Sequence, residues 1–165
     1  MSSKTDDRGD ILEALNHAMR RSGAQGSLFS QAVAARVGIS ASDFECLDLA
    51  ILESAVTPGR LAEASGLTTG AITGVIDRLE RAGFVRRDPD PSDRRRVLVR
   101  PVPDGVRVIG PYYKSLVTQL NAILGDLDTD ALARLLALYT RVNEVFAGEI
   151  VALKDVPDKP NDAAA

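Results

Sequence analysis

The sequence contains very few of the side chains that metal and thiol chemistry require. It has one cysteine, Cys46, and one histidine, His17, in 165 residues. A single cysteine excludes an intramolecular disulfide and a multi-cysteine zinc site, and no carboxylates are grouped to complete a metal cluster. An enzyme would need a nucleophile with a base, paired carboxylates or a metal. We therefore expect no metal, no cofactor and no enzymatic activity.

Long apolar runs are also absent. No stretch approaches the ~18 apolar residues of a membrane span, and the acidic N-terminal segment does not resemble a signal peptide. We therefore expect a cytoplasmic protein without a membrane partner. The length of 165 residues fits one domain, or one compact fold with a helical appendage, and the hydrophobic content of 45% is enough for a real core. Polar composition predicts a flexible N-terminal tail over residues 1–9 and a disordered tail over residues 154–165.

The formal net charge of −3 conceals a basic centre. Residues 60–100 hold nine arginines, no lysine and six carboxylates, whereas residues 1–59 and 101–165 are each net acidic. A local basic face between acidic segments orients a protein on DNA. A guanidinium can grip a phosphate or a guanine edge with two hydrogen bonds, or enter a narrow minor groove. The alternative interpretation is a solvated charged hairpin.

The segment before most of these arginines has the spacing of a helix-turn-helix. Ala62 is followed four residues later by Gly66 and then by apolar Ile72, so two helices can cross closely around a glycine turn. Thr57 is predicted to cap the first helix, with Pro58 at its first position. The second helix is predicted from Thr68 or Thr69 to Ala82, ended by Gly83, with a buried face made of Ile72, Val75, Ile76 and Leu79.

The opposite face of this second helix is predicted to be exposed and to carry small residues and threonines. Such a face can sink into a major groove, where threonine hydroxyls and methyls meet base edges. Two glycines there lower helix stability, which a purely structural role does not explain. The residues on or near this face are Thr68, Thr69, Gly70, Ala71, Thr73, Gly74, Asp77 and Arg81.

Two segments after this helix alternate as strands do. They are Phe84–Asp88 and Arg96–Val102, separated by a turn that two prolines stiffen. Together they predict a protruding β-hairpin wing.

Apolar residues at helical spacing predict the remaining elements. One long or broken helix is expected from about Asp10 to Arg36. The next is expected to open with a capping box of Ser42 and Glu45 and to turn one side inward, formed by Phe44, Leu47, Ile51 and Leu52. After the wing we expect a helix starting at Pro103-Asp104, kinked near Pro111 and broken at Gly125, and a last helix capped by Asp128 or Thr129.

The apolar surface of that last helix is too wide for burial against one partner helix, which predicts a dimer. The domain organisation that we expect is therefore an N-terminal dimerisation helix over residues 10–37, a winged helix-turn-helix over residues 38–102 and C-terminal dimerisation helices over residues 103–153. The fold class is mainly α, with a two-stranded wing.

The run from Leu67 to Arg87, followed by the run from Asp88 to Val99, resembles the MarR (multiple antibiotic resistance regulator) family. The order of helices around it is also similar, so the resemblance covers about residues 10–150. It implies a dimer whose terminal helices form the interface and which binds near-palindromic operators. It also implies a repressor that is released by a small, often aromatic, effector. Some relatives sense oxidants through a cysteine near the first helix, a position that Cys46 does not match.

The resemblance also assigns residues. The Asp-x-Arg wing motif of the family falls on Asp93 and Arg95, which implies that Arg95 enters the minor groove while Asp93 holds its guanidinium. Arg100–Gly105 departs from the Leu-Thr that commonly follows the second wing strand. The arginines and carboxylates that we predict to lie at the DNA interface, beside the small residues above, are Asp77, Arg78, Arg81, Asp93, Arg94, Arg95 and Arg96.

Other interpretations of single residues are structural. Cys46 lies in an apolar-faced helix and is expected to be a small buried hydrophobe. His17 is expected at the surface or an interface, with the lining of an effector pocket as the alternative. The competing function is a protein-interaction module that uses a winged helix without reading DNA. Exposed threonines and wing arginines favour a dimeric, sequence-specific DNA-binding transcriptional regulator, because an interaction face would show large apolar anchors.

Overall fold

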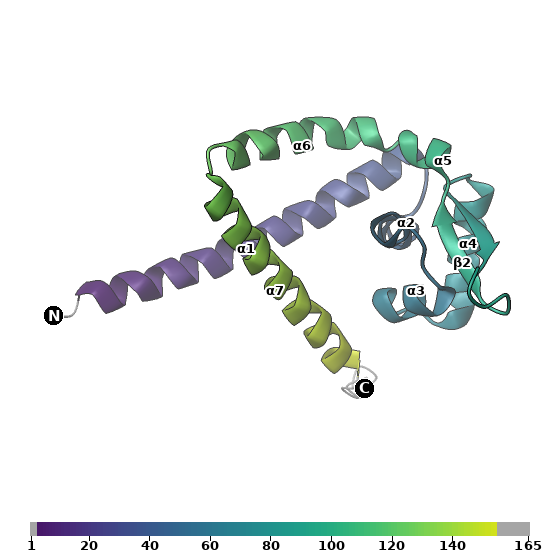
Figure 1. The fold of residues 1–165 in the computed structure, drawn as a ribbon, viewed down its shortest axis with the longest axis horizontal. Coiled ribbons are helices and arrows are strands. Elements are labelled where there is room, and N and C mark those ends of the chain that lie inside the picture. Colours follow the sequence, from purple (N-terminus) through teal and green to yellow (C-terminus); the bar gives the residue numbers. More distant parts are fainter. Residues whose placement is uncertain (1–2, 155–165) are drawn as a thin grey trace, which may run out of the picture. The chain divides into compact units, whose positions relative to one another are not determined.

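The structure is a computed structural model that describes residues 3–154 of the chain (Figure 1). Its elements, in chain order, are α1 (Ser3–Val37), α2 (Ala41–Glu53), α3 (Pro58–Ser65), α4 (Thr69–Arg81), β1 (Val85–Pro89), β2 (Val97–Pro101), α5 (Pro103–Arg107), α6 (Gly110–Gly125) and α7 (Thr129–Lys154). They divide into two compact units, one ending at Tyr112 and the other beginning at Tyr113. The predicted fold class, mainly helical with a two-stranded wing and helices at both ends, is confirmed.

Local capping signals set the limits of the helix-turn-helix, as predicted. The Thr57 hydroxyl accepts a hydrogen bond from the Arg60 amide at 3.2 Å, and Pro58 is the first residue of α3. Gly66 ends α3 with a φ of 72°, a left-handed conformation that glycine adopts without steric cost. Thr68 then caps α4 by accepting from the Ala71 amide at 3.3 Å.

The core of the first unit gathers around α4, which packs against α2, α3 and β1. All four residues of its predicted apolar face are buried, and the burial of such surface is the main favourable term in folding. The largest fully buried side chains of the unit come from three helices, both strands and one loop, and they are Phe44, Leu47, Val56, Leu61, Ile72, Ile76, Leu79, Val85 and Val99.

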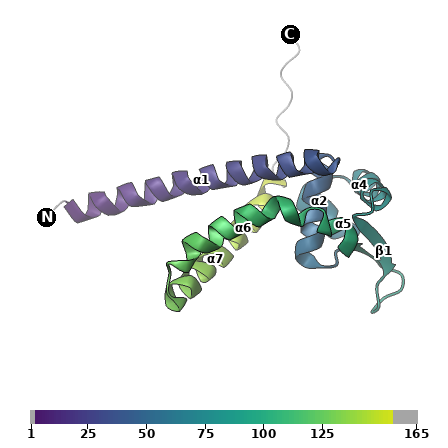
Figure 2. The ribbon, with the colours of Figure 1, turned by 90° about the horizontal axis from the view of Figure 1, so that it is seen from above.

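The wing is an antiparallel pair in which Val85 lies opposite Pro101 and Pro89 lies opposite Val97. Figure 2 shows the turn of this hairpin extending away from α2 and α4. Val56, between α2 and α3, adds one further bridge to β2: its amide donates to Val99 at 3.0 Å and its carbonyl accepts at 2.8 Å. This bridge was not predicted, because a single paired residue produces no alternating pattern in the sequence. It ties the base of the wing to the helix-turn-helix.

Several predicted helix limits in the first part of the chain differ from the structure. α1 is continuous and begins at Ser3 rather than Asp10, so most of the predicted N-terminal tail is helical. Apolar periodicity marks only the part of a helix that buries a face. The cap of α2 is Ser40, which accepts from the Asp43 amide at 3.1 Å, and not Ser42. Leu52, predicted on the buried side, is 78% exposed, since the buried stripe ends earlier, at Ala50.

The helix predicted after the wing is divided into α5 and α6 at Val108 and Ile109. Pro111 does not kink it, because it stands in the first turn of α6, where a backbone N–H would have no helical acceptor. Ile109 is buried in the first unit. Gly125 ends α6 as predicted, and the Asp128 carboxylate caps α7 by accepting from the Ala131 amide at 2.7 Å.

The second unit presents a broad apolar surface along α6 and α7. A groove of about 690 Å³ between these two helices is lined by Leu120, Ile123, Leu124, Leu132, Leu135, Leu136 and Tyr139. Further along α7, Val145, Phe146 and Ile150 are also exposed. The tail predicted over residues 154–165 lies, apart from Lys154, outside the described residues. Between residues 3 and 154, no helix has both the length and the apolar content that crossing a membrane requires.

Candidate nucleic-acid interface

The N-terminal half of α4 exposes only small side chains. Thr68, Thr69, Gly70, Ala71 and Thr73 are all exposed. The Thr73 hydroxyl donates to the backbone carbonyl of Thr69 at 3.0 Å, and the Thr68 hydroxyl is occupied as the helix cap. The Thr69 hydroxyl makes no hydrogen bond to another described residue. Because these side chains are small, α4 can approach another surface closely. The Thr69 hydroxyl is available for a hydrogen bond to that surface.

Asp77, predicted on the same face, is engaged with the wing. Its carboxylate accepts a hydrogen bond from the Arg87 guanidinium at 2.6 Å. The same guanidinium pairs with Glu80, and the Arg87 amide donates to Glu80 at 3.1 Å. β1 is therefore attached to the outer side of α4 by a cluster of one arginine and two carboxylates.

Arg78, predicted as a DNA contact, points toward α2. Its Nε donates to Asp43 Oδ2 at 2.9 Å and its terminal nitrogen donates to Asp43 Oδ1 at 2.6 Å. Asp43 is one of the few buried charged residues of the described chain. Sequence reasoning did not single it out, since the two residues are 35 positions apart. The hydrogen bonds from Arg78 hold the pKa of the Asp43 carboxyl below its usual range.

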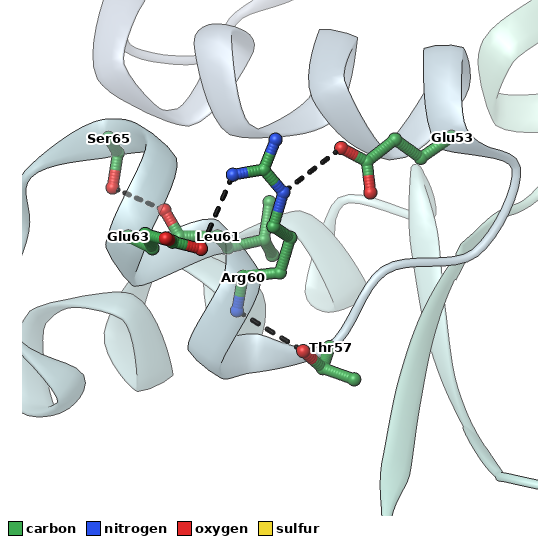
Figure 3. Close-up of polar contacts among 6 residues, drawn as sticks. All are labelled: Glu53, Thr57, Arg60, Leu61, Glu63 and Ser65. Carbon is green, nitrogen blue, oxygen red and sulfur yellow. Dashed lines mark hydrogen bonds and ion pairs between the residues drawn. The ribbon is translucent and has the colours of Figure 1, made fainter. Parts of the chain in front are cut away.

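Three further arginines of the basic segment are also paired with carboxylates. Arg86 and Arg100 both reach Asp88, at 2.9 Å and 3.5 Å. Arg60, at the start of α3, donates to Glu53 of α2 and to Glu63, each at 3.3 Å (Figure 3). These contacts join α3 to the end of α2.

Two carboxylates order the tip of the wing. Asp90 accepts from both the amide and the hydroxyl of Ser92, at 2.8 Å and 2.7 Å. Asp93 accepts from the backbone amide of Arg95 at 3.0 Å. No ion pair joins the Asp93 carboxylate to the Arg95 guanidinium, so Asp93 holds the backbone of Arg95 and not, as predicted, its side chain. The turn is fixed while its arginine side chains remain available.

The arginines between Arg78 and Arg100 thus fall into two groups. Those with a carboxylate partner are Arg78, Arg86, Arg87 and Arg100. Those that form no ion pair within the described residues are Arg81, Arg94, Arg95 and Arg96, all of them exposed. The first group lies where α4 and the base of the wing meet the rest of the unit. The second group, referred to below as the unpaired arginines, lies at the end of α4 and at the wing tip.

Cys46 and His17 lie outside this surface. Cys46 is buried in α2, as predicted, and burial raises the pKa of its thiol, which disfavours the reactive thiolate. His17 is exposed on α1.

The chain is similar to known winged-helix regulators. A sequence model of the MarR family matches residues 39–97, which include α2, α3, α4 and most of the wing. The multiple antibiotic resistance protein MarR of Escherichia coli (strain K12) is 30% identical over 105 residues, covering 63% of this chain and 73% of that protein. The chain belongs to the MarR family.

Other comparisons agree with this membership. The HTH-type transcriptional regulator YcgE of Bacillus subtilis (strain 168) is 28% identical over 152 residues, covering 92% of this chain and 99% of that protein. The crystal structure of E. coli MarR in its apo form matches with a TM-score of 0.52 and 25% identity over 78% of this chain and 95% of that one. Tm0710 of Thermotoga maritima, at 23% identity, shares the fold with a TM-score of 0.58, covering 84% of this chain and 98% of that one.

Membership in this family establishes the general function. This MarR-family chain is an HTH-type DNA-binding transcriptional regulator and not an enzyme.

Proposed function

We propose that this MarR-family chain acts as a homodimer that binds a near-palindromic operator in double-stranded DNA. In this proposal α4 of each protomer enters a major groove, and the wing reaches the neighbouring minor groove. The observation that supports it most is the division of the arginines. Internal carboxylates neutralise the arginines at the base of the wing, whereas Arg81, Arg94, Arg95 and Arg96 form no ion pair within the described residues and are exposed, which leaves them available for phosphates.

The small exposed residues of α4 support a base-reading role. Thr69 is available for base edges, and Gly70 and Gly74 add no side chain that would keep the helix out of the groove. A Cβ at position 70 would meet no atom of the chain within 4 Å, so packing does not require glycine there. The alternative function, a protein-interaction module, would be favoured by large apolar anchors, and this face has none.

The dimer follows from the apolar surfaces that the single chain leaves exposed. α1 exposes Ile11, Leu15 and Leu28, and α6 and α7 together expose the groove described above. Contiguous apolar patches of this kind mark interfaces. We assign dimerisation to residues 10–37 and 103–153 and DNA binding to residues 38–102.

The regulatory part of the proposal rests on family membership. A dimer that covers an operator next to a promoter excludes other proteins from it, which favours a repressor, and a small aromatic effector would release it. Such a regulator works in the cytoplasm, where it meets the operator. Release of the bound duplex by 2-hydroxybenzoate, used as a probe of that chemical class, tests the effector separately from DNA binding.

The central experiment is selection of duplexes from a random library by the purified full-length chain. We expect enrichment of one inverted repeat whose half-sites lie about 10 base pairs apart, since two symmetry-related helices must enter successive major grooves on one face. Sedimentation should give a dimer, alone and on the duplex. Failure to enrich any duplex would favour the protein-interaction module, and a monomer bound to a single half-site would refute the dimer.

A further inference from the structure

The contact between Asp43 of α2 and Arg78 of α4 differs from every other ion pair of the described chain in its burial. The Asp43 side chain is only 4% exposed, while the Arg78 side chain is 51% exposed. Both carboxylate oxygens accept, at 2.9 Å from Nε and 2.6 Å from the terminal nitrogen. Burying a charged carboxylate destabilises the folded state unless the carboxylate is paired in this way. Loss of the contact would leave the Asp43 charge buried and unpaired, which favours keeping the contact.

The geometry of the pair restricts how α4 can move. The contacts that α4 makes through Ile72, Val75 and Leu79 are apolar, and apolar burial is non-directional. Apolar contacts alone would tolerate a small rotation of the helix about its axis. A bidentate guanidinium–carboxylate pair is planar and directional, and it tolerates much less.

The Asp43 end of the pair is itself held in place. The Asp43 amide donates to the Ser40 hydroxyl in the cap of α2, and Phe44 and Leu47 are buried in the core next to it. Arg78 lies in the last turn of α4, so its anchor is a fixed point for the helix that carries Thr69 and Thr73.

We propose that Asp43 and Arg78 are positioning residues for DNA recognition, which fix the rotation of α4 so that Thr69 and its neighbours face the bases. Arg78 is then not a phosphate contact, although it belongs to the arginine-rich segment. This inference rests on the proposed DNA-binding function. It adds a residue of α2, remote from the exposed face of α4, to the determinants of specificity.

The substitution Asp43→Asn separates the two roles of Arg78 by the sign of its effect. If Arg78 is a phosphate contact, removal of the Asp43 charge frees a cation and tightens binding to every duplex. If the pair positions α4, the same substitution weakens binding to the selected duplex by five-fold or more and leaves binding to a random duplex the same or slightly tighter. Arg78→Lys keeps the charge, loses the planar fork and should reproduce the loss of discrimination.

Salt dependence provides a second test of the same assignment. Each phosphate contact contributes about 0.9 to the slope of log affinity against log salt. Arg78→Ala should lower affinity for the selected duplex and leave this slope unchanged, whereas loss of a phosphate contact would reduce it. Glu53→Gln is the matched control, because Glu53 is also a carboxylate of α2 that pairs with an arginine, but its partner is the half-exposed Arg60 of α3 and not a residue of α4. It should alter neither the ratio of affinities nor the slope.

A measurement without DNA keeps this inference separate from the proposed function. Hydrogen exchange of the α4 amides in the full chain should become faster in Asp43→Asn and remain at the wild-type rate in Glu53→Gln. Thermal unfolding of Asp43→Asn, Arg78→Gln and the double variant should show non-additive effects. If the wild-type chain selects no duplex, the proposed function fails, while these two measurements still test the anchor. Wild-type exchange rates in Asp43→Asn, or binding of that variant as tight as wild type, would overturn the inference.

Discussion

Arg87 of β1 donates a hydrogen bond from its guanidinium to the Asp77 carboxylate of α4 at 2.6 Å. The same side chain pairs with Glu80, one turn further along the helix. The wing and α4 are thus joined by side chains as well as by the backbone that connects them. In the proposed complex with DNA, a fixed angle between α4 and the wing lowers the cost of ordering the two elements on binding.

Arg87→Ala should weaken binding to the selected duplex several-fold with little loss of thermal stability, since partly exposed ion pairs contribute at most about 1 kcal/mol. Fluorescence anisotropy of a labelled duplex measures the affinity. Arg86→Ala is the control, because Arg86 lies next in the strand and, among the residues that the structure describes, its ion pair is with Asp88 of the same strand. Equal defects in both variants would show that the strand contributes charge alone.

Arg95→Ala should weaken binding by several-fold and reduce the salt slope by about 0.9, the value for one phosphate contact. Arg94→Ala and Arg96→Ala should cost less if their side chains flank the wing while Arg95 enters the minor groove. Asp93→Ala should give a smaller defect than Arg95→Ala, because it loosens the backbone that carries Arg95 without removing a charge. If all three arginines prove interchangeable in the titrations, the wing tip is a diffuse basic patch.

Thr69→Ala should reduce the ratio of affinities for selected and random duplexes, at a cost of about 1–3 kcal/mol for a lost base contact. Thr68→Ala is the comparison, because it removes the cap of α4 and should lower stability by about 1 kcal/mol. Competition titrations and thermal unfolding distinguish the two losses. An equal loss of affinity on both duplexes in Thr69→Ala would refute its base-contact role.

Gly105→Ala should destabilise the winged helix severely. A Cβ at position 105 would lie 2.1 Å from the carbonyl oxygen of Gly83, a backbone atom that cannot turn aside. Overpacking typically costs about 1–3 kcal/mol, and a clash with backbone lies at the upper end. Gly70→Ala is the matched control, since that site is open. Differential scanning calorimetry should show a lower Tm for Gly105→Ala only, and equal Tm values would contradict the close approach.

Asp48→Asn should stabilise the chain at neutral pH. Burial raises the pKa of the Asp48 carboxyl. No hydrogen bond or ion pair to a described residue offsets this effect of burial. The folded state therefore keeps this proton to higher pH than the unfolded state does. The free energy of unfolding then falls as pH rises from about 3.9 through the raised pKa. The gain should appear as a higher Tm of Asp48→Asn at pH 7. An unchanged Tm at pH 7, or the same gain at pH 3, would contradict this account.

Short-range signals in the sequence were enough for the helix-turn-helix and the wing. Thr57-Pro58, Gly66, Thr68 and Gly83 mark helix ends through interactions within a few residues, and the structure places those ends where the sequence predicts them. The apolar face of α4 was predicted in full for the same reason, because helical periodicity is a local property. Helix ends without an apolar stripe or an unambiguous cap were misplaced, as at Ser3 and Ser40.

The sequence by itself determined the fold class, the basic centre of the chain and the exposed face of small residues on α4, since each depends on residue order and composition. Only the tertiary structure decided which arginines are neutralised. Asp43 reaches Arg78 across 35 residues, and Asp77 reaches Arg87 across ten. Such pairs depend on how α2, α4 and β1 pack, so a list of arginines cannot separate the ones that form ion pairs within the protein from the ones that remain unpaired in the described residues.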